Sequence, residues 1–210
     1  MTVKISHDLR RTLGPIRDQG ARPTCLAHAT SVAHEASRGI DLPLSPEYLH
    51  YFSTKGVVTS GSTIADVRAA LSKDGQPLES DCPYRPAIGS TAWTPPSPVE
   101  VFRRNSEPRK ADVSEVESAI SKGNVPVLGI ALPDPFYIPA DPWIIPATGT
   151  VRGLHAVAAV ATGQLGTKRL VLVRNSWGST WGDSGHAWLD EGFLGQHLRA
   201  LLVLTHEIAA

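Results

Sequence analysis

Four polar residues have the types and the order along the chain that nucleophilic acyl chemistry requires. Cys25 lies in RDQGARPTCLAHAT, His155 in GLHAVAAV and Asn175 in VRNSWGSTWGDSGHAWL, 130 and 150 residues after the cysteine. A thiol becomes a good nucleophile at neutral pH when an imidazole takes its proton and a third polar group orients that imidazole. The amide of Gln19 and the backbone N–H of Cys25 could then form an oxyanion hole.

Cys25 by itself does not support this interpretation, because free cysteine is among the most buried residue types. Its place after Thr24, which is expected to cap a helix, favours the thiolate, since a helix N-terminus lowers the pKa of a thiol. Cys82 lacks such partners and is interpreted as structural. The N-terminal stretch MTVKISHDLRRTLG has no apolar leader, so we expect a cytoplasmic, reducing location and two free thiols.

The composition argues against several other classes of function. The 210 residues include 20 basic and 20 acidic side chains, with no basic stripe of the kind that binds nucleic acid. No run of 18 apolar residues is present, so we expect no membrane span. No spacing of His, Cys, Asp or Glu matches a metal site, and no phosphate-binding or dinucleotide motif occurs. We therefore expect neither a metal nor a cofactor.

The first half of the chain is predicted to be helical, which places Cys25 at a helix start. Thr24 begins a helix to about residue 38, and Gly39 ends it. Three further helices are expected where a capping residue precedes apolar residues at helical spacing. Their capping residues are Ser45, Thr63 and Asp112.

The second half is predicted to form strands, at 125–132, 155–162, 169–175, 185–190 and 198–204. Between the two halves, the proline-rich segment 83–108 is expected to be a connector, and the charged run 102–110 a solvated part of it. The 21-residue segment 133–153 carries aromatic residues and is expected to wrap near a site. The prediction is one domain, 1–210, with a helical lobe of about 14–108, a β lobe of about 109–210 and a cleft between them.

The motifs around these residues resemble those of the papain-like cysteine peptidases, family C1. RDQG…TC is similar to the glutamine turn before the nucleophile of that family, HAV to its histidine strand, and NSWGSTWGDSG to its asparagine segment. The resemblance covers about residues 14–206. It implies an α+β, papain-like two-lobe fold with an N-terminal helical lobe, a C-terminal antiparallel β-barrel-like lobe and the active-site cleft between. It also implies a cysteine endopeptidase without a cofactor.

The resemblance assigns a role to each matching residue. Cys25 would be the nucleophile, His155 the general base and acid, Asn175 its orienter and Gln19 the oxyanion donor. The family binds an extended polypeptide substrate through main-chain hydrogen bonds of the β-augmentation type. The implied substrate-binding positions are Trp177, which would shield the Asn–His hydrogen bond, Gly61, which would pair with the substrate backbone, and Ser62, Thr63, Leu154 and Ala156, which would line the pocket for the second side chain of the substrate.

The chain departs from the family pattern next to the nucleophile. Pro23, Thr24 and Leu26 replace the family's glycine, serine and tryptophan, and the second cysteine of QCGSCW is missing from ARPTCL. Only 13 residues precede Gly14, so we expect no inhibitory pro-segment and propose a regulatory protein partner instead. Two alternatives stay open. One is a non-catalytic module that binds peptides or a partner, and the other is an acyl transferase or peptide ligase that uses the same acyl-enzyme.

Overall fold

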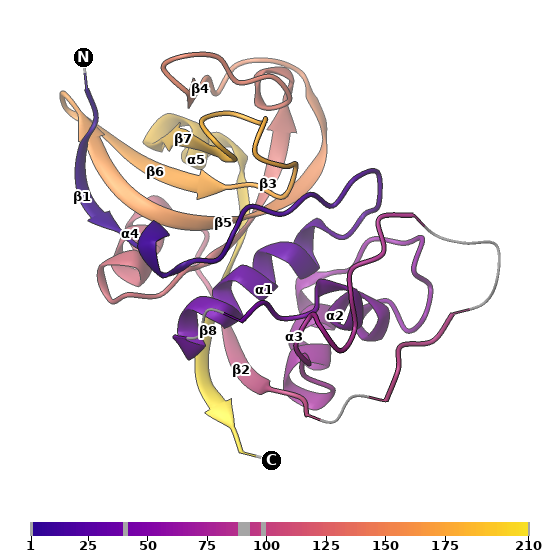
Figure 1. Cartoon of the computed structure of the whole chain (residues 1–210). Helices are drawn as coiled ribbons and strands as arrows, with labels where there is room; N and C mark the ends of the chain where they lie inside the picture. Colours follow the sequence, from indigo (N-terminus) through magenta and orange to yellow (C-terminus); the bar gives the residue numbers. More distant parts are fainter. Residues whose placement is uncertain (1, 40–41, 88–92, 98–99, 210) are drawn as a thin grey trace.

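The computed structural model describes residues 2–39, 42–87, 93–97 and 100–209, which form a helical lobe and a sheet lobe (Figure 1). None of the helices in this part of the chain has the length and hydrophobicity needed to cross a membrane. Two single-turn 3₁₀ helices, η1 (Arg10–Thr12) and η2 (Asp134–Phe136), lie in loops. The α-helices are α1 (Cys25–Arg38), α2 (Pro46–Ser53) and α3 (Ile64–Lys73) in the helical lobe, with α4 (Val113–Ser121) and α5 (Glu191–His197) packed on the sheet.

The sheet contains eight strands within the described residues, in the order β2-β8-β3-β5-β6-β7-β4, and β1 pairs with the distal half of β5. β4 runs parallel to β7, whereas the other pairs are antiparallel. The order leaves β2 and β4 at the two ends, so the sheet is open and mixed and the predicted barrel does not close. The strands are β1 (Lys4–Asp8), β2 (Arg103–Arg109), β3 (Val127–Pro133), β4 (Ile144–Ile145), β5 (Val151–Leu165), β6 (Lys168–Arg174), β7 (His186–Asp190) and β8 (Leu198–Ile208).

The long strand β5 faces both cores of the molecule and thereby orients the site. Ala156 and Ala158 pack in the cluster that contains Leu26 and Ala29 of α1. Val157 and neighbouring alternate positions pack in a second cluster with α4 and α5. Because successive side chains of a strand point to opposite faces, β5 joins the helical lobe on one face and its own lobe on the other.

Three of the four predicted helix caps are confirmed. The side chains of Ser45, Thr63 and Asp112 each accept a hydrogen bond from the backbone N–H three residues further on. Thr24 is the N-cap residue of α1 and Gly39 follows the helix, as predicted, but the Thr24 side chain makes no capping hydrogen bond. The Thr24 hydroxyl instead lies 2.9 Å from the hydroxyl of Tyr84, which comes from a distant part of the chain.

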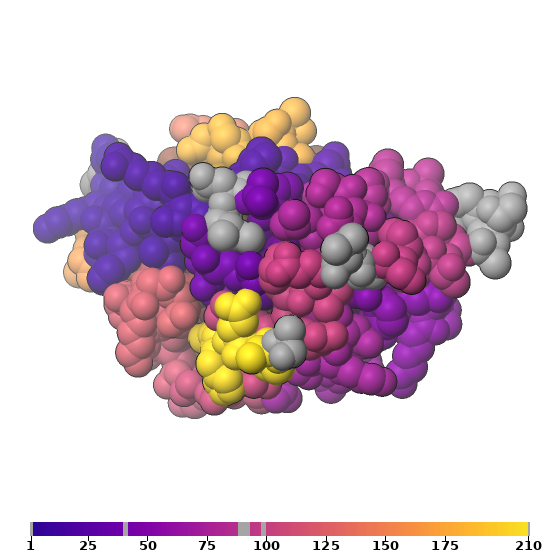
Figure 2. Space-filling view, turned by 60° about the horizontal axis from the view of Figure 1, so that its bottom comes forward, coloured from indigo at the N-terminus to yellow at the C-terminus, as the bar shows by residue number. Residues whose placement is uncertain are grey.

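The charged run 102–110 is not a solvated connector as predicted. Residues 103–109 form strand β2, which pairs with β8 near the C-terminus. Arg104 is 7% exposed, and its side chain donates a hydrogen bond to the carbonyl of Thr205. Figure 2 shows the yellow C-terminal residues against the pink residues of β2 on one face of the molecule. Part of the predicted connector, 88–92 and 98–99, lies outside the described residues.

The segment 133–153 is anchored by aromatic residues, as the sequence predicts. Phe136 is fully buried, and its carbonyl accepts a hydrogen bond of 2.9 Å from the indole of Trp181. The next residue, Tyr137, stacks on Trp177 with the ring centroids 5.6 Å apart. The segment therefore packs against the residues that follow Asn175.

A buried ion pair joins the loop before α1 to α2. Arg22 and Glu47 are 5% and 1% exposed, and the Glu47 carboxylate also accepts the backbone N–H of Arg85. Removing one partner of a buried pair leaves the other charge uncompensated, so Glu47→Gln is expected to lower the free energy of unfolding by about 3 kcal/mol. Urea unfolding checks this. The double replacement Arg22→Met/Glu47→Leu should recover part of the loss, and a Glu47→Gln variant as stable as the wild type would contradict the prediction.

Candidate active site

Cys25 is the first residue of α1, at the end of the helix where backbone N–H groups are unpaired. Burial raises the pKa of its thiol, and hydrogen bonding to the backbone N–H groups of Ala156, Leu26 and Cys25 itself opposes that rise. Since the Thr24 side chain makes no capping hydrogen bond, it does not compete for these groups. The Ala156 contact places the sulfur beside β5, directly after His155.

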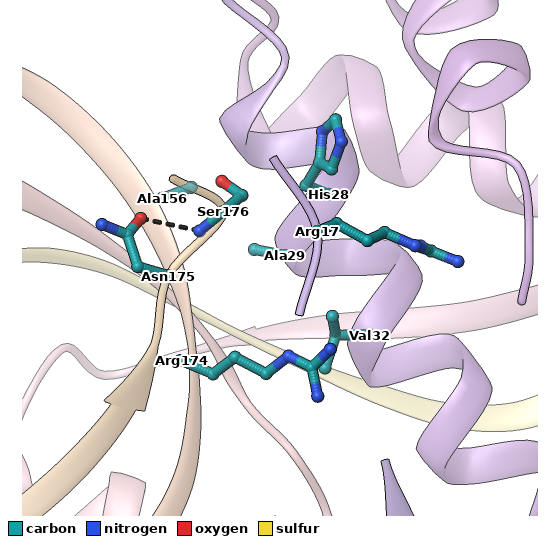
Figure 3. A pocket seen from close by; sticks show the side chains of 8 residues that line it. All are labelled: Arg17, His28, Ala29, Val32, Ala156, Arg174, Asn175 and Ser176. Carbon is teal, nitrogen blue, oxygen red and sulfur yellow. Dashed lines mark hydrogen bonds between the residues drawn. The ribbon is translucent and has the colours of Figure 1, made fainter. Parts of the chain in front are cut away.

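His155 and Asn175 form a buried hydrogen-bonded pair. The chain leaves β6 at Arg174, which pairs with Ala158 of β5, so Asn175 lies next to His155. The Nε2 of His155 is 2.7 Å from the Oδ1 of Asn175. The backbone N–H of Ser176 also donates to this Oδ1 at 2.8 Å, shown in Figure 3, which identifies the oxygen as the acceptor. His155 therefore carries its proton on Nε2 and leaves Nδ1 free to accept one.

The surroundings of His155 keep the imidazole neutral. Burial lowers its pKa to about 4, while the hydrogen bond with Asn175 acts in the opposite direction. The ring of Trp177 lies 4.6 Å from the imidazole, and that of Phe136 lies 6.0 Å away. A neutral imidazole shielded by aromatic rings has the form that a general base needs at neutral pH.

The side chain of Gln19 is held by hydrogen bonds at both ends. Its Nε2 donates to the Arg22 carbonyl at 2.7 Å, and its Oε1 accepts from the Ser176 hydroxyl at 2.6 Å. An amide nitrogen has two protons, so one N–H remains for an oxyanion. Ser176, which the sequence analysis did not select, links Asn175 to Gln19 through its backbone and its hydroxyl. Its place between Asn175 and Trp177 in the motif was the available signal.

A small cavity between the lobes lies beside this constellation (Figure 3). Asn175 and Ser176 line it from the sheet lobe, opposite His28, Ala29 and Val32 of α1. Arg174 also lines it and donates a hydrogen bond of 2.7 Å to the Gly14 carbonyl, which ties the N-terminal segment to the sheet. The cavity is a gap in the interface between the lobes and is too small for a peptide side chain.

The residues predicted to bind substrate lie in different settings. Gly61 is exposed. It lies beside Pro23, because a Cβ added to Gly61 would be 4.0 Å from the Cβ of Pro23. Thr63 uses its hydroxyl to cap α3. Ala156 is buried next to the sulfur, whereas Leu154 is 77% exposed. Ser62 is half-buried, and its Oγ has no hydrogen-bond partner among the described residues. The two cysteines are free, and no described group of His, Cys, Asp and Glu is arranged to hold a metal.

A helical lobe and a sheet lobe, with a cysteine at a helix N-terminus and a His–Asn pair on the facing sheet, define a papain-like cysteine protease architecture. The sequence profile described as papain family cysteine protease matches residues 4–197. The chain belongs to the papain family of cysteine proteases.

Individual relatives agree with this assignment. The chain is 26% identical over 195 residues to Cysteine proteinase 3 of Entamoeba histolytica, which covers 86% of this chain and 61% of that protein. It is 30% identical over 196 residues to Peptidase 1 of Dermatophagoides farinae, which covers 88% of this chain and 60% of that protein. The chain thus spans about three fifths of the length of these relatives.

Solved structures confirm the predicted α+β, papain-like fold. Xylellain, a cysteine protease from Xylella fastidiosa, has a TM-score of 0.79 and 21% identity, with 97% of this chain and 87% of that chain covered. The bromelain protease from Ananas comosus, in complex with the E64 inhibitor, has a TM-score of 0.75 and 21% identity, with 94% and 97% covered.

Proposed function

We propose that this chain is a cysteine endopeptidase that hydrolyses peptide bonds through Cys25, His155, Asn175 and Gln19. The observation that carries the proposal is the hydrogen-bonded pair of His155 on β5 and Asn175 directly after β6, next to a cysteine at the N-terminus of α1. The relatives named above are all called proteases or peptidases. These names favour neither the binding module nor the ligase.

The geometry supports a two-step acyl transfer. The Nδ1 of His155 takes the thiol proton as the sulfur attacks the peptide carbonyl carbon, and the negative charge collects on the carbonyl oxygen. The Cys25 backbone N–H and the free N–H of Gln19 stabilise that oxygen. The imidazolium then gives its proton to the departing amine, which leaves a thioester on Cys25. Water, deprotonated by His155, attacks the thioester and releases the acid and the free thiol.

The substrate in this proposal is an extended polypeptide that lies along the boundary between the two lobes. Gly61, exposed beside Pro23, would offer its backbone to the substrate chain. Ser62, Thr63, Leu154 and Ala156 stay proposed neighbours of the second side chain, and Trp177 a proposed cover of the His–Asn bond. A regulatory protein partner and a cytoplasmic location also stay predictions.

Digestion of a denatured proteome with the wild-type chain and with Cys25→Ala tests the proposal. New N-termini are expected with the wild type and with Cys82→Ala, the matched control, and none with Cys25→Ala. The sequences around the new termini report the subsite preference. If Cys25→Ala cleaved as the wild type does, or if the wild type produced no new termini, the proposal would be wrong.

Gln19→Ala is expected to lower kcat for peptide hydrolysis by about 10²-fold, because one oxyanion donor is lost. KM should change little, since the oxyanion exists only in the transition state. Steady-state kinetics on a peptide substrate measure both constants. Gln196→Ala, at an exposed position of α5, serves as the control and should match the wild type. A Gln19→Ala effect confined to KM would contradict the assigned role.

A further inference from the structure

Tyr84, which none of the motifs includes, reaches the turn that carries the candidate oxyanion site. Its hydroxyl donates to the backbone carbonyl of Gln19 at 2.7 Å and lies 2.9 Å from the hydroxyl of Thr24. The Gln19 carbonyl can only accept, so the single proton of Tyr84 is used there. Thr24 must then donate its own proton to Tyr84. The two hydrogen bonds run in one direction, from Thr24 through Tyr84 to Gln19.

This arrangement closes the turn between Gln19 and Cys25. Thr24 precedes the cysteine directly, and Gln19 supplies the second oxyanion donor, so Tyr84 links the two sides of the site from outside the turn. The other polar groups of Gln19 are held by Ser176 and Arg22. Arg22 belongs to the turn itself and Ser176 to the sheet lobe. Among the described hydrogen-bond partners of Gln19, Tyr84 alone lies outside both.

Neighbouring groups hold the Tyr84 ring in place. The imidazole of His28 meets it edge-on with 4.6 Å between centroids, and the guanidinium of Arg22 lies 5.3 Å from its centroid. Arg22 is fixed in turn by the buried carboxylate of Glu47. Burial raises the pKa of the Tyr84 hydroxyl, so it stays a donor. Such packing gives the hydroxyl one defined position.

We infer that Tyr84 is a positioning residue, whose hydroxyl keeps the Gln19 amide and the Cys25 backbone N–H at the separation that an oxyanion requires. The inference rests on the proposed function and adds to it a residue that touches neither substrate nor the reacting atoms. Small displacements of oxyanion donors weaken transition-state binding while the substrate still binds. The loss should therefore fall on kcat.

Tyr84→Phe, which removes the hydroxyl and keeps the ring, is the first test. We expect KM to stay within about 2-fold. We expect kcat to fall about 10-fold, which is less than the loss in kcat when an oxyanion donor is missing altogether. A peptide aldehyde, whose adduct places an oxygen in the oxyanion site, should bind about 10-fold more weakly. Iodoacetamide, which forms no oxyanion, should alkylate Cys25 at nearly the wild-type rate. Tyr48→Phe on α2, a buried tyrosine outside this network, is the control.

The Gln19→Ala background separates positioning from a general structural role. There the amide is gone, so adding Tyr84→Phe should lower kcat by less than about 3-fold. Thr24→Val should weaken aldehyde binding in the same direction, and Thr24→Ser, which keeps the hydroxyl, should restore it. A full 10-fold loss in the Gln19→Ala background, or wild-type kcat for Tyr84→Phe, would overturn this inference alone. An inactive wild-type chain would overturn the proposed function and this inference together.

Discussion

His155→Ala is expected to lower kcat for peptide hydrolysis by about 10⁴-fold. The Cys25 thiol has its pKa raised by burial, so little thiolate exists at neutral pH without a base beside it. In the proposed mechanism the free Nδ1 of His155 is that base, and the same nitrogen later protonates the departing amine. Steady-state kinetics with a peptide substrate measure the loss.

His206→Ala is the matched control, since His206 is exposed on β8 and should leave kcat unchanged. Alkylation of Cys25 by iodoacetamide adds a readout that does not depend on substrate. Its rate at pH 7 should also fall in His155→Ala. If kcat fell by less than 10-fold, another group would have to serve as the base and the assigned role would be wrong.

Acidification is expected to destabilise the fold strongly below pH 6.5. Burial lowers the pKa of His28 to about 3 and that of His34 to about 4. Below pH 6.5 the unfolded chain binds protons at these imidazoles, whereas the folded chain does not. The contribution of the two neutral histidines to the free energy of unfolding is therefore fully present above pH 6.5 and decreases as the pH falls towards 4. At pH 4.5 the loss for two histidines is about 5 kcal/mol.

The structure around His34 explains why it cannot accept a proton readily. Its Nδ1 donates to the Oε1 of Gln76 at 2.9 Å, and its Nε2 is buried without a partner among the described residues. Arg104 and Arg38 also repel the imidazolium. Glu35, whose pKa is raised by burial, acts in the opposite direction, but one carboxyl offsets only part of the effect of two imidazoles.

Urea unfolding followed by tryptophan fluorescence between pH 7.5 and 4.5 measures this loss. The double variant His28→Gln/His34→Gln starts less stable but should lose about 5 kcal/mol less over the same range. His206→Gln should follow the wild type. A free energy of unfolding that stays constant from pH 7.5 to 5 would contradict the prediction.

Local sequence signals predicted α1 to α4 and most strands, but they missed α5 and the contacts between distant segments. Ser45, Thr63 and Asp112 cap helices as expected, because capping depends on the next three residues only. Thr24 also has a residue type that favours capping, but its hydroxyl contacts a residue distant in the sequence, the Tyr84 hydroxyl. Strand β2 was missed because its charged, proline-containing sequence becomes a strand through pairing with β8.

The candidate site could be predicted as residue types in order, and the structure adds their hydrogen bonds. His155 and Asn175 were selected from motifs, but that Nε2 carries the proton follows only from the 2.7 Å contact with the asparagine oxygen. Ser176 and Tyr84 were not selected, since each bonds Gln19 across a long sequence separation; Ser176 at least lies within the asparagine motif, whereas no motif includes Tyr84. Leu154 was expected in a pocket wall and is 77% exposed.

Cys25 is synthesised well before the residues that the fold brings next to it, because the strands of the sheet lobe lie late in the chain. His155 on β5 and Asn175 directly after β6 lie in the last third of the sequence, and β8, later still in the chain, pairs with β3 and β2 in the same sheet. A nascent chain therefore exposes Cys25 long before its partners exist. Under the proposed function, the thiol gains His155 as its base, Asn175 as the orienter of that base and the Ser176 contact to Gln19 only after the sheet has assembled. Under the proposed function, cleavage therefore requires that β5 and the residues after β6 have been synthesised and have folded against α1.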